Sequence, residues 1–557
     1  MPPSVTTNLA QALAEAVALH QQGDLARAEK IYTRILKARR DHFDALHLLG
    51  LLKHQAGKTG EAYRLISAAL AVNARSADAR SNLGLVLHAL KRDADALASF
   101  EQALALDPGH VEALNNRGTA LLKLGRPADA LDAFERLLAV SPRHLEARVN
   151  RANALLDLDR VEEAIAAYDA VLAVQPGHAG AHFNRGNALA RRDRWQEAIV
   201  AYDRAIMLTP GYVKAHNNRG LALKALNRDQ EALASYGRAS ALDKDFAEAR
   251  LNAAHVLLTI GDFARGFPAY EWRWKIPAMA PHRRAFRQPL WLGTSNIGGK
   301  TILLHAEQGL GDTIQFARYA KPLARAGAKV VLEVAPALKP LLSTMDGAVR
   351  VVAQGEALPA FDLHCPFASL PLAFKTELSS IPVEIPYLAA PAERLEKWRQ
   401  RMEGLARPRI ALAWSGNAAH ANDRNRSIPL ARLAPLWSRE GASFVSVQRE
   451  VREGDASALA GAARLVHFGD DLSDFADTAA VLALADLVIS VDSAVAHLAG
   501  AMGRPAWILL PFSPDWRWML AREDSPWYPT ARLFRQPAIG GWASVVERLR
   551  LELPRAS

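Results

Sequence analysis

The pattern of apolar and polar positions divides the chain into two parts. Up to about residue 277, small and aromatic residues recur every 34 positions with helical spacing, whereas from residue 300 onward short apolar runs alternate with amphipathic stretches. The first pattern is typical of stacked helical hairpins, and the second predicts parallel α/β lobes with a cleft between them. Between the two parts the chain has the proline and glycine content of a linker. We expect repeats in residues 1–275, a linker in 276–299, and α/β lobes in 300–390 and 391–557.

Four registers define the repeats of the first part. One unit contains Gly84, Ala96, Phe100 and Pro108, and the same residue types return in neighbouring units at multiples of 34 residues. The small residues let two helices pack closely, the aromatic ring fills the space between them, and proline ends the second helix. The pattern resembles the tetratricopeptide repeat, which implies an α solenoid of antiparallel helix pairs over about residues 8–277.

A fifth register places asparagine in the first helix of six successive units. Asparagine is a mediocre helix former, so its repetition in mid-helix needs a reason. A ladder of side-chain amides on the concave face of a solenoid can bind the backbone of an extended peptide, and similar ladders belong to the repeat domain of the protein O-GlcNAc transferases. The alternatives are local hydrogen bonding within the helices and a generic protein-docking array. The candidate acceptor-binding residues are Asn82, Asn116, Asn150, Asn184, Asn218 and Asn252.

The clearest strand and helix signals of the second part lie near its C-terminal end. A β-branched run at 487–491 is followed by Asp492 and Ser493, then by an apolar stripe at helical spacing, a glycine, and a second apolar run at 506–510. This order predicts a strand, a capped helix and another strand. A helix N-terminus at the carboxyl end of a parallel strand is a natural anion site, because its first N–H groups have no partners in the helix.

Three short motifs carry a second resemblance. They are Gly309-Leu310-Gly311-Asp312, residues 413–417 with 424–429 downstream, and Asp492-Ser493-Ala494 with His497. In this order they resemble the glycosyltransferase family that contains the lipopolysaccharide heptosyltransferases, glycosyltransferase family 9. The resemblance implies the two-lobed GT-B fold, in which each lobe is Rossmann-like.

The resemblance also implies roles for single residues. Asp312 would be the general base that takes the proton of an acceptor hydroxyl. A helix N-terminus, a hydroxyl and a guanidinium would stabilise the diphosphate of the donor without a metal. Ala494, Ile428 and Arg426 replace the usual glycine, aromatic residue and lysine, which leaves the sugar and the base of the donor open. The candidate donor-binding residues are Ser415, Gly416, Asn417, Arg424, Arg426, Gln448, Glu450, Asp492, Ser493, Ala494 and His497.

Several of these residues also have a purely structural interpretation. Asp312 and Asp492 can cap the helices that follow them, and His497 can be a satisfied core histidine. The tryptophans of residues 513–529 are expected to pack rather than stack on a base, and those of the linker to pack the last repeat on the next domain. No His, Asp or Glu cluster has metal-ligand spacing and no Asp-x-Asp ends a predicted strand, so we expect no metal.

Composition narrows the class of protein further. The single cysteine, Cys365, excludes an internal disulfide framework. No apolar run reaches 18 residues, and the N-terminus lacks the basic start and apolar core of a signal peptide, so we expect a soluble cytoplasmic protein without a transmembrane segment. The net charge of +10 is dispersed rather than clustered, so nucleic acid is not an expected partner.

The sequence thus favours a metal-independent GT-B glycosyltransferase that needs no cofactor. Its expected donor is a nucleotide-diphosphate sugar, and its expected acceptor is a Ser or Thr hydroxyl of a protein bound on the concave face of the repeats. Two alternatives stay open. The enzyme could act on a glycan or lipopolysaccharide, or the chain could be a scaffold for protein interactions whose transferase lobes have lost activity.

Overall fold

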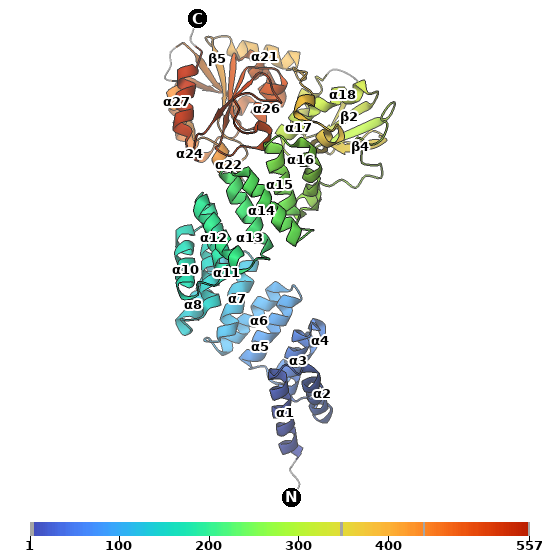
Figure 1. Cartoon of the computed structure of the whole chain (residues 1–557), viewed down its shortest axis with the longest axis vertical. Helices are drawn as coiled ribbons and strands as arrows, with labels where there is room; N and C mark the ends of the chain where they lie inside the picture. Colours follow the sequence, from blue (N-terminus) through green and yellow to red (C-terminus); the bar gives the residue numbers. More distant parts are fainter. Residues whose placement is uncertain (1–4, 346–348, 421, 438–440, 555–557) are drawn as a thin grey trace. The chain divides into compact units, whose positions relative to one another are not determined.

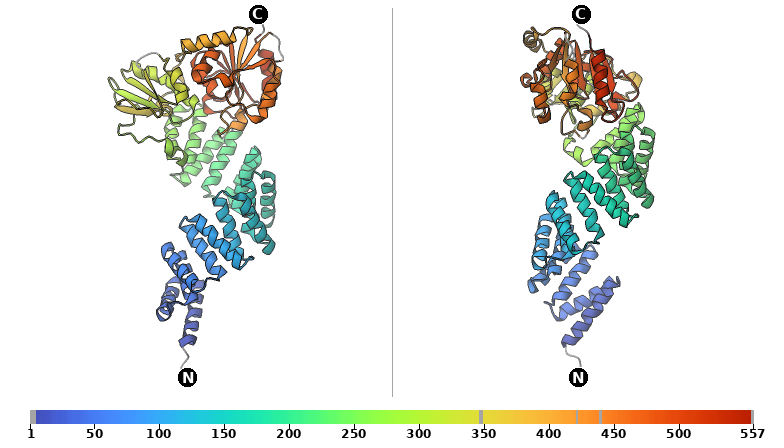
Figure 2. Two further views of the ribbon diagram at one scale, coloured as in Figure 1. Left: turned by 180° about the vertical axis from the view of Figure 1, so that it is seen from behind. Right: turned by 90° about the vertical axis from the view of Figure 1, so that its left-hand side faces the viewer.

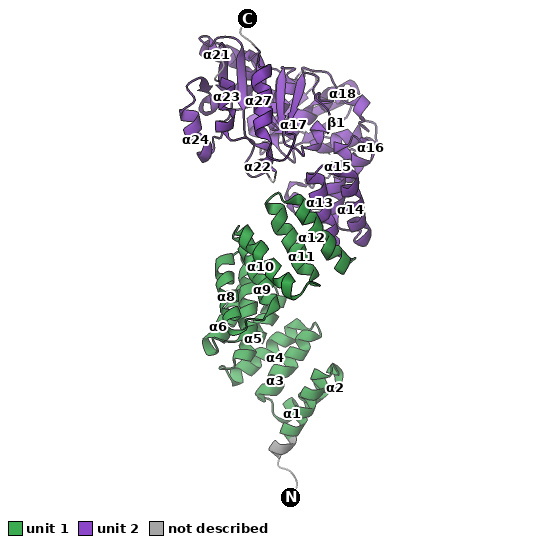
Figure 3. Ribbon diagram, turned by 60° about the vertical axis from the view of Figure 1, so that its left-hand side comes forward, with its two compact units in different colours: residues 1–210 green, residues 211–557 purple. Residues whose placement is uncertain are grey.

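The computed structural model describes residues 5–345, 349–420, 422–437 and 441–554. The chain forms two compact units, unit 1 (Met1–Pro210) and unit 2 (Gly211–Ser557), which are coloured separately in Figure 3. Unit 1 is a stack of helix pairs, and unit 2 contains two further helix pairs and both α/β lobes. The boundaries expected at residues 275, 299 and 390 stay predictions.

Unit 1 has two antiparallel helices for each 34-residue period (Figure 1). A Cβ atom on Gly84 would lie 2.4 Å from Cε1 of Phe100, so a glycine is needed where these two helices meet. Leu106 ends its helix and Pro108 follows two positions later, as the repeat pattern predicts. The tetratricopeptide solenoid is therefore confirmed. Its helices are α1 (Val5–Gln21), α2 (Leu25–Ala38), α3 (Phe43–Gln55), α4 (Thr59–Val72), α5 (Ala77–Ala89), α6 (Asp93–Leu106), α7 (Val111–Lys123), α8 (Pro127–Val140), α9 (Leu145–Asp157), α10 (Val161–Val174), α11 (Ala179–Arg191) and α12 (Trp195–Leu208).

Unit 2 begins with four more helices of the same period and two short 3-10 helices. We call α15 and α16 the final repeat. Just before the linker, Arg273 is fully buried, whereas Trp272 and Trp274 are only half-buried. The tryptophan of the linker itself is Trp291, which was expected to pack this repeat on the next domain. Trp291 does join the core and packs edge-on against Phe374. The elements are α13 (Val213–Ala225), α14 (Asp229–Leu242), α15 (Ala247–Thr259), α16 (Phe263–Tyr270), η1 (Glu271–Lys275) and η2 (Pro277–His282).

Lobe 1 is built on a four-stranded parallel sheet in the order β3-β2-β1-β4. The helix expected at 314–326 begins earlier, at Leu310, and is broken into three pieces; Pro322 in the last of them has no N–H to continue the helical ladder. The strands are β1 (Thr301–His305), β2 (Lys329–Val334), β3 (Val349–Ala353) and β4 (Leu363–Pro366). The helical segments are α17 (Leu310–Phe316), η3 (Ala317–Tyr319), α18 (Ala320–Arg325), η4 (Pro336–Leu338), α19 (Lys339–Leu342), η5 (Phe367–Ser369), α20 (Leu370–Ala373) and η6 (Leu378–Ser380).

Lobe 2 is built on a six-stranded parallel sheet in the order β10-β9-β8-β5-β6-β7, drawn in orange to red in Figure 2. Apolar runs at 409–414, 443–447, 464–467, 486–491 and 506–510 predict five of its strands within one residue, whereas the sequence pattern gives no prediction for β10, α24 and α27. The strands are β5 (Arg409–Ala413), β6 (Ser443–Ser446), β7 (Leu465–His467), β8 (Leu487–Val491), β9 (Ala506–Leu510) and β10 (Ala531–Arg535). The helical segments are α21 (Ala392–Met402), α22 (Asp423–Arg426), η7 (Leu430–Leu433), α23 (Ala434–Trp437), α24 (Glu453–Ala460), η8 (Gly469–Asp471), α25 (Phe475–Leu484), α26 (Ala494–Ala501), η9 (Trp516–Trp518) and α27 (Trp542–Glu552).

The strand orders place one topological switch point in each sheet. In lobe 2 the chain runs outward from β5 through β6 and β7, then returns to the other side of β5 and continues through β8, β9 and β10. In lobe 1 the same reversal falls between β1 and β4. Loops that leave neighbouring strands in opposite directions open a crevice at their carboxyl ends, and ligands of parallel α/β sheets bind there. The candidate site should therefore follow β5 and β8.

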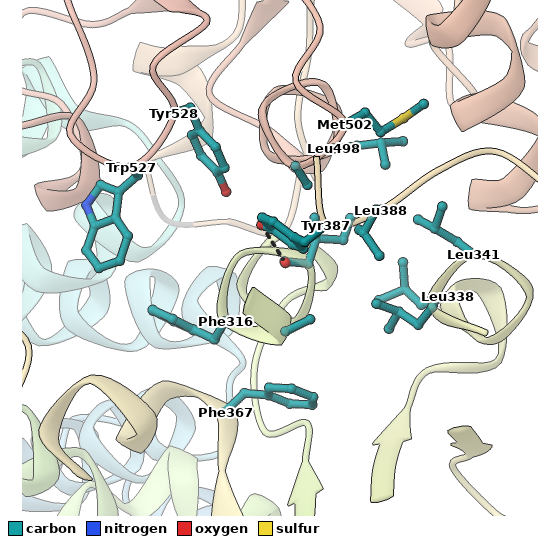
Figure 4. Close-up of a cluster of buried hydrophobic side chains, with 14 of the residues drawn as sticks. Phe316, Leu338, Leu341, Phe367, Tyr387, Leu388, Leu498, Met502, Trp527 and Tyr528 are labelled. Atoms are coloured by element: carbon teal, nitrogen blue, oxygen red, sulfur yellow. Dashed lines mark hydrogen bonds between the residues drawn. The ribbon is translucent and has the colours of Figure 1, made fainter. Parts of the chain in front are cut away.

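The two lobes share one apolar core. Figure 4 shows Tyr387 and Leu388 between Leu338 and Leu341 of lobe 1 and the lobe 2 helix α26, and all of these residues belong to a single buried cluster. The Tyr387 hydroxyl donates a hydrogen bond to the Ile314 carbonyl at 3.1 Å.

No helix among the described residues combines the length and apolarity that crossing a membrane requires.

Candidate functional site

The loops that follow β5 and β8 meet at the lobe 2 switch point. Ser493, and not Asp492, caps α26, because its hydroxyl accepts the Val495 N–H at 3.3 Å. The expectation that Asp492 caps this helix is therefore wrong: only 8% of Asp492 is exposed, and it lies inside the site. Burial, and then the nearby charge of Asp515, raise the pKa of Asp492 to about 6.

Arg426 joins the two loops. Its Nη1 donates to the Asp492 carbonyl oxygen at 3.1 Å, and its guanidinium covers Gly416 so closely that a Cβ there would lie 2.5 Å from Nη2. Within the described residues, the buried hydroxyl of Ser415 and the buried Nε of Arg426 have no hydrogen-bond partner, although Nε lies 3.6 Å from Oδ1 of Asp423 in an ion pair. Unsatisfied buried polar groups are rare and costly, so two of them at a switch point indicate a place for a polar ligand.

His497 lies one helical turn after these groups. Its Nδ1 is 3.0 Å from the Tyr528 hydroxyl, and its ring stacks on Trp518 with centroids 5.3 Å apart. Burial, and then the charge of Arg517, lower the pKa of His497 to about 3, so the ring is neutral at pH 7. A Cβ on Gly311 of lobe 1 would lie 2.8 Å from its Cδ2, so α17 and α26 are in direct contact. The ring is packed as in a core, yet it stands where the two lobes meet.

Asp312 lies on the lobe 1 side of this contact. It is the third residue of α17, which begins at Leu310, so the expectation that Asp312 caps a helix that follows it is wrong. Its Oδ2 instead reaches back and accepts the N–H of the N-cap residue Gly309 at 3.0 Å. Its Oδ1 is ion-paired with Nη2 of Arg517 from lobe 2. The same guanidinium donates from Nη1 to Oδ1 of Asp515 at 2.8 Å and from Nε to the Gln315 side chain at 2.5 Å. Arg517 thus holds a carboxylate from each lobe.

Sequence reasoning missed Asp515 and Arg517. Burial disfavours the ionised form of Asp515, but the adjacent Arg517 outweighs it and lowers the pKa to about 2. The partner of Arg517 in lobe 1 lies 205 residues away in sequence, so no local pattern points to it. The signal that was available is a charged pair inside a tryptophan-rich stretch. The expectation that these tryptophans pack is met by Trp516, Trp518 and Trp527, which are all at most 3% exposed.

The remaining donor candidates lie at the edge of the site. Gln448 is buried, but its Oε1 accepts the N–H groups of Trp414 and Ser415 at 3.1 Å, so it shapes the turn after β5. Asn417 accepts the Ala419 N–H at 2.9 Å. Asn417, Arg424 and Glu450 are exposed. The structure therefore brings together Ser415, Gly416, Arg426, Asp492, Ser493, Ala494, His497 and Asp312.

Several asparagines of the ladder form side-chain hydrogen bonds with other residues of the repeats. In unit 1, Nδ2 of Asn184 donates to Oδ1 of Asn153 at 3.0 Å, and Nδ2 of Asn82 lies 2.8 Å from Nε2 of His47. In unit 2, Nδ2 of Asn252 donates to Oδ1 of Asn217 at 3.0 Å. Longer contacts of 3.5 Å involve Asn150. These bonds join successive helix pairs, which supplies the local reason for asparagine and leaves peptide binding a prediction.

The site shows no obvious metal ligands. Across the described ranges, no group of three or more His, Cys, Asp or Glu side chains is arranged to hold an ion. Positive charge at the switch point comes from Arg426, from the N-terminus of α26 and from Arg452, which donates to the Gly416 carbonyl at 3.3 Å.

Segments of both parts of the chain match models of known protein families. Residues 13–63, 115–173 and 149–213 match one tetratricopeptide repeat model, and residues 75–143 match another. Residues 473–510 match the model of glycosyltransferase family 9 (heptosyltransferase). This match covers α25, β8, α26 and β9, and so includes one side of the candidate site.

Among curated proteins, Protein FlbA of Caulobacter vibrioides is 28% identical over 325 residues, which is 54% of each chain. The chain therefore spans about half the length of this relative. Two solved structures resemble the repeats. A tetratricopeptide repeat protein from Parabacteroides merdae is 17% identical over 45% of this chain and 99% of its own, with a TM-score of 0.39. The protein YrrB is 24% identical over 33% of this chain and 95% of its own, with a TM-score of 0.30.

Proposed function

We propose that this chain transfers a sugar from a nucleotide-diphosphate donor to an acceptor hydroxyl. The observation that supports this most is the convergence of three groups at the lobe 2 switch point. They are the α26 N-terminus, the buried Ser415 Oγ, which has no hydrogen-bond partner among the described residues, and the buried Arg426 Nε, which forms a long ion pair with Asp423 at 3.6 Å. A diphosphate leaving group gains negative charge as the glycosidic bond breaks, and such groups stabilise that charge without a metal. The family 9 match over residues 473–510 supports the same class of reaction.

The acceptor side of the proposal rests on Asp312. This carboxylate would take the proton from the acceptor hydroxyl as the oxygen attacks the anomeric carbon and the diphosphate leaves. One of its oxygens accepts the Gly309 N–H and the other pairs with Arg517, which leaves lone pairs that can accept the proton of a hydroxyl. Ser or Thr hydroxyls of a protein held by the repeats are the acceptors we favour. A glycan or lipopolysaccharide is the alternative.

The donor is identified by thermal unfolding against a panel of UDP-, GDP-, ADP-, CMP- and dTDP-sugars with the bare nucleotides as controls. A ligand at 100 times its Kd should stabilise the protein by about 2.7 kcal/mol and raise the midpoint. Ser415→Ala should leave the midpoint of the free protein unchanged, because its hydroxyl has no partner there. It should weaken the successful ligand about tenfold, since a hydrogen bond to a charged group contributes about 1.5 kcal/mol.

A scaffold that has lost catalysis remains the rival, and Asp312→Ala separates the two. If the chain is a transferase, its Asp312→Ala variant should still bind the donor sugar but should release no nucleotide from it. If no nucleotide of the panel shifts the midpoint of the wild-type protein, the transferase proposal fails. Partner capture on the repeats would then be the next experiment.

A further inference from the structure

The switch-point crevice of lobe 1 is filled by a residue that follows the final repeat. The turn after β1 carries Glu307, and the segment after β4 carries Ser369. Nη2 of Arg273 donates to Glu307 Oε1 at 2.9 Å and to Ser369 Oγ at 2.7 Å. Only 1% of Arg273 is exposed. The guanidinium therefore lies where a parallel sheet of this kind offers a ligand site.

Neighbours of Arg273 hold the same two segments. Glu271 accepts from Arg273 Nη1 at 2.6 Å and from the Ser369 hydroxyl at 2.8 Å. Tyr270, the last residue of α16, accepts a hydrogen bond from Nε2 of Gln308 at 2.8 Å. Burial raises the pKa of Glu307 to about 7 against the opposing effect of Arg273, as expected for a carboxylate kept from water.

The turn that contains Glu307 and Gln308 is followed directly by the helix that carries the proposed base, Asp312. Gln308 precedes Gly309, whose N–H is bound by the Asp312 carboxylate at 3.0 Å. A displacement of Gln308 therefore moves the backbone to which Asp312 is fixed, and misplacing a catalytic group by about 1 Å can cost about 100-fold in rate.

We propose that Tyr270 and Arg273 are positioning residues for Asp312, so that the final repeat is part of the catalytic unit as well as of the solenoid. The inference rests on the proposed transferase function. It follows that the part of the lobe 1 crevice between Glu307 and Ser369 is closed to the acceptor, because Arg273 occupies it. It also follows that the lobes without the final repeat lose turnover even when the acceptor needs no recruitment.

The test compares two tyrosines at the same register in successive repeats. Tyr270→Phe removes the hydroxyl that binds Gln308 and keeps the ring. Tyr236→Phe is the matched control, because the buried Tyr236 hydroxyl has no hydrogen-bond partner among the described residues. The full-length proteins are compared by nucleotide release from each donor sugar of the panel, with water as acceptor, and by donor affinity from thermal unfolding.

We expect Tyr270→Phe to lower kcat by roughly tenfold with unchanged donor affinity, and Tyr236→Phe to match the wild type in both. Equal kcat in the two variants would overturn the proposal. A merely structural role for Tyr270 would lower the unfolding midpoint and leave kcat alone.

A second readout does not depend on activity. Hydrogen exchange of the peptide over residues 306–313 should be faster in Tyr270→Phe than in Tyr236→Phe or the wild type. If the wild-type protein turns over no donor but this difference in exchange is present, the proposed transferase function is wrong. The conclusion that Tyr270 fixes the turn at residues 306–313 then remains supported. If exchange is equal in all three proteins, the positioning role is wrong whatever the activity.

Discussion

Tyrosine stands at the same repeat position in a repeat of unit 1 and in the final repeat, but its hydroxyl binds different partners in the two regions. In unit 1 the Tyr168 hydroxyl donates to Oδ1 of Asn153 at 2.6 Å, so the repeat satisfies its own polar groups. In the final repeat the equivalent tyrosine is Tyr270, the equivalent of Asn153 is His255, and the hydroxyl binds Gln308 of lobe 1 instead. In the final repeat the tyrosine hydroxyl thus contacts lobe 1 and not its own repeat.

The ion pairs of the two regions differ in the same way. Arg185 of unit 1 donates to Asp169 at 2.6 Å, and half of the Asp169 side chain is exposed. The Arg273 and Glu307 side chains are each only 1% exposed. Exposed pairs contribute little because water and salt screen them, whereas breaking a buried pair leaves an uncompensated charge. The comparison therefore predicts very different consequences for two similar substitutions.

The largest expected effect is that of Arg273→Leu. Removing the guanidinium leaves Glu307 buried and unpaired, which should destabilise unit 2 by about 3–5 kcal/mol. Urea unfolding followed by tryptophan fluorescence measures this, since Trp195 is the one tryptophan of the sequence outside unit 2. The control Arg185→Ala, followed by far-UV circular dichroism, should cost unit 1 about 1 kcal/mol or less. Similar losses in both variants would contradict the contrast between buried and exposed pairs.

The second prediction concerns a turn in the repeat before the final one. Asn227 has φ 56°, as does Asp159 at the equivalent position in unit 1. Nδ2 of Asn227 donates to the Phe512 carbonyl of lobe 2 at 2.8 Å. Asn227→Asp keeps a residue that tolerates this backbone but removes the donor, and should cost unit 2 about 1–2 kcal/mol. The measurement is again urea unfolding.

The reverse exchange, Asp159→Asn, is the control in unit 1. It should change the stability of unit 1 by less than about 0.5 kcal/mol, because surface substitutions away from special contacts have small effects. A neutral Asn227→Asp would mean that the contact with lobe 2 contributes nothing.

Much of the fold and part of the site could be predicted from the sequence. The repeats were predictable because each register repeats a packing requirement, such as the absence of a side chain at Gly84. Ser415, Asp492 and His497 were predictable because short motifs follow strands whose apolar runs are clear. The strand order that brings them together, with β5 beside β8, is a long-range property that no local pattern contains.

The contacts among the lobes and the repeats that sequence reasoning missed join residues that are distant in the chain. Arg517 meets Asp312 across 205 residues, and Arg273 meets Ser369 across 96. An arginine between two tryptophans, as Arg273 is, suggests a solvated charge, because arginine is rarely buried without a partner. The partner exists only once both sheets have formed. Asp492 illustrates the opposite error, since an aspartate before a helix suggests a cap, yet Ser493 takes that role.

The third prediction concerns His255, which stands in the final repeat at the position that Asn153 occupies in unit 1. It uses the pH dependence of stability. Burial lowers the pKa of His255 to about 4. Between this value and the ordinary 6.5 the unfolded chain binds more protons, so the contribution of His255 is complete above pH 6.5 and is lost as the pH falls. From pH 8 to pH 5.5 wild-type unit 2 should lose roughly 1.4 kcal/mol more than His255→Asn.

The comparison with His255→Asn isolates this histidine from other titrating groups. His305 and His497 have pKa values lowered to about 3 and act in the same direction, whereas Glu307 and Asp492, with raised values, act in the opposite one. All four are common to both proteins and cancel in the difference. Parallel pH profiles for the two proteins would show that His255 does not titrate on unfolding.

The smallest effect separates the two reasons for the asparagine ladder. Asn184→Ala removes the bond to Asn153 and should destabilise unit 1 by about 1 kcal/mol, read by urea unfolding. Asn116 has no side-chain hydrogen bond among the described residues, and Asn116→Ala should leave stability unchanged. If the ladder also binds the acceptor, both substitutions should raise the acceptor KM. If KM rises only for Asn184→Ala, or for neither, the ladder stabilises the repeats and does not bind a peptide. Asn116 is therefore the decisive position, because in the part of the chain that the structure describes no hydrogen bond of its side chain accounts for an asparagine there.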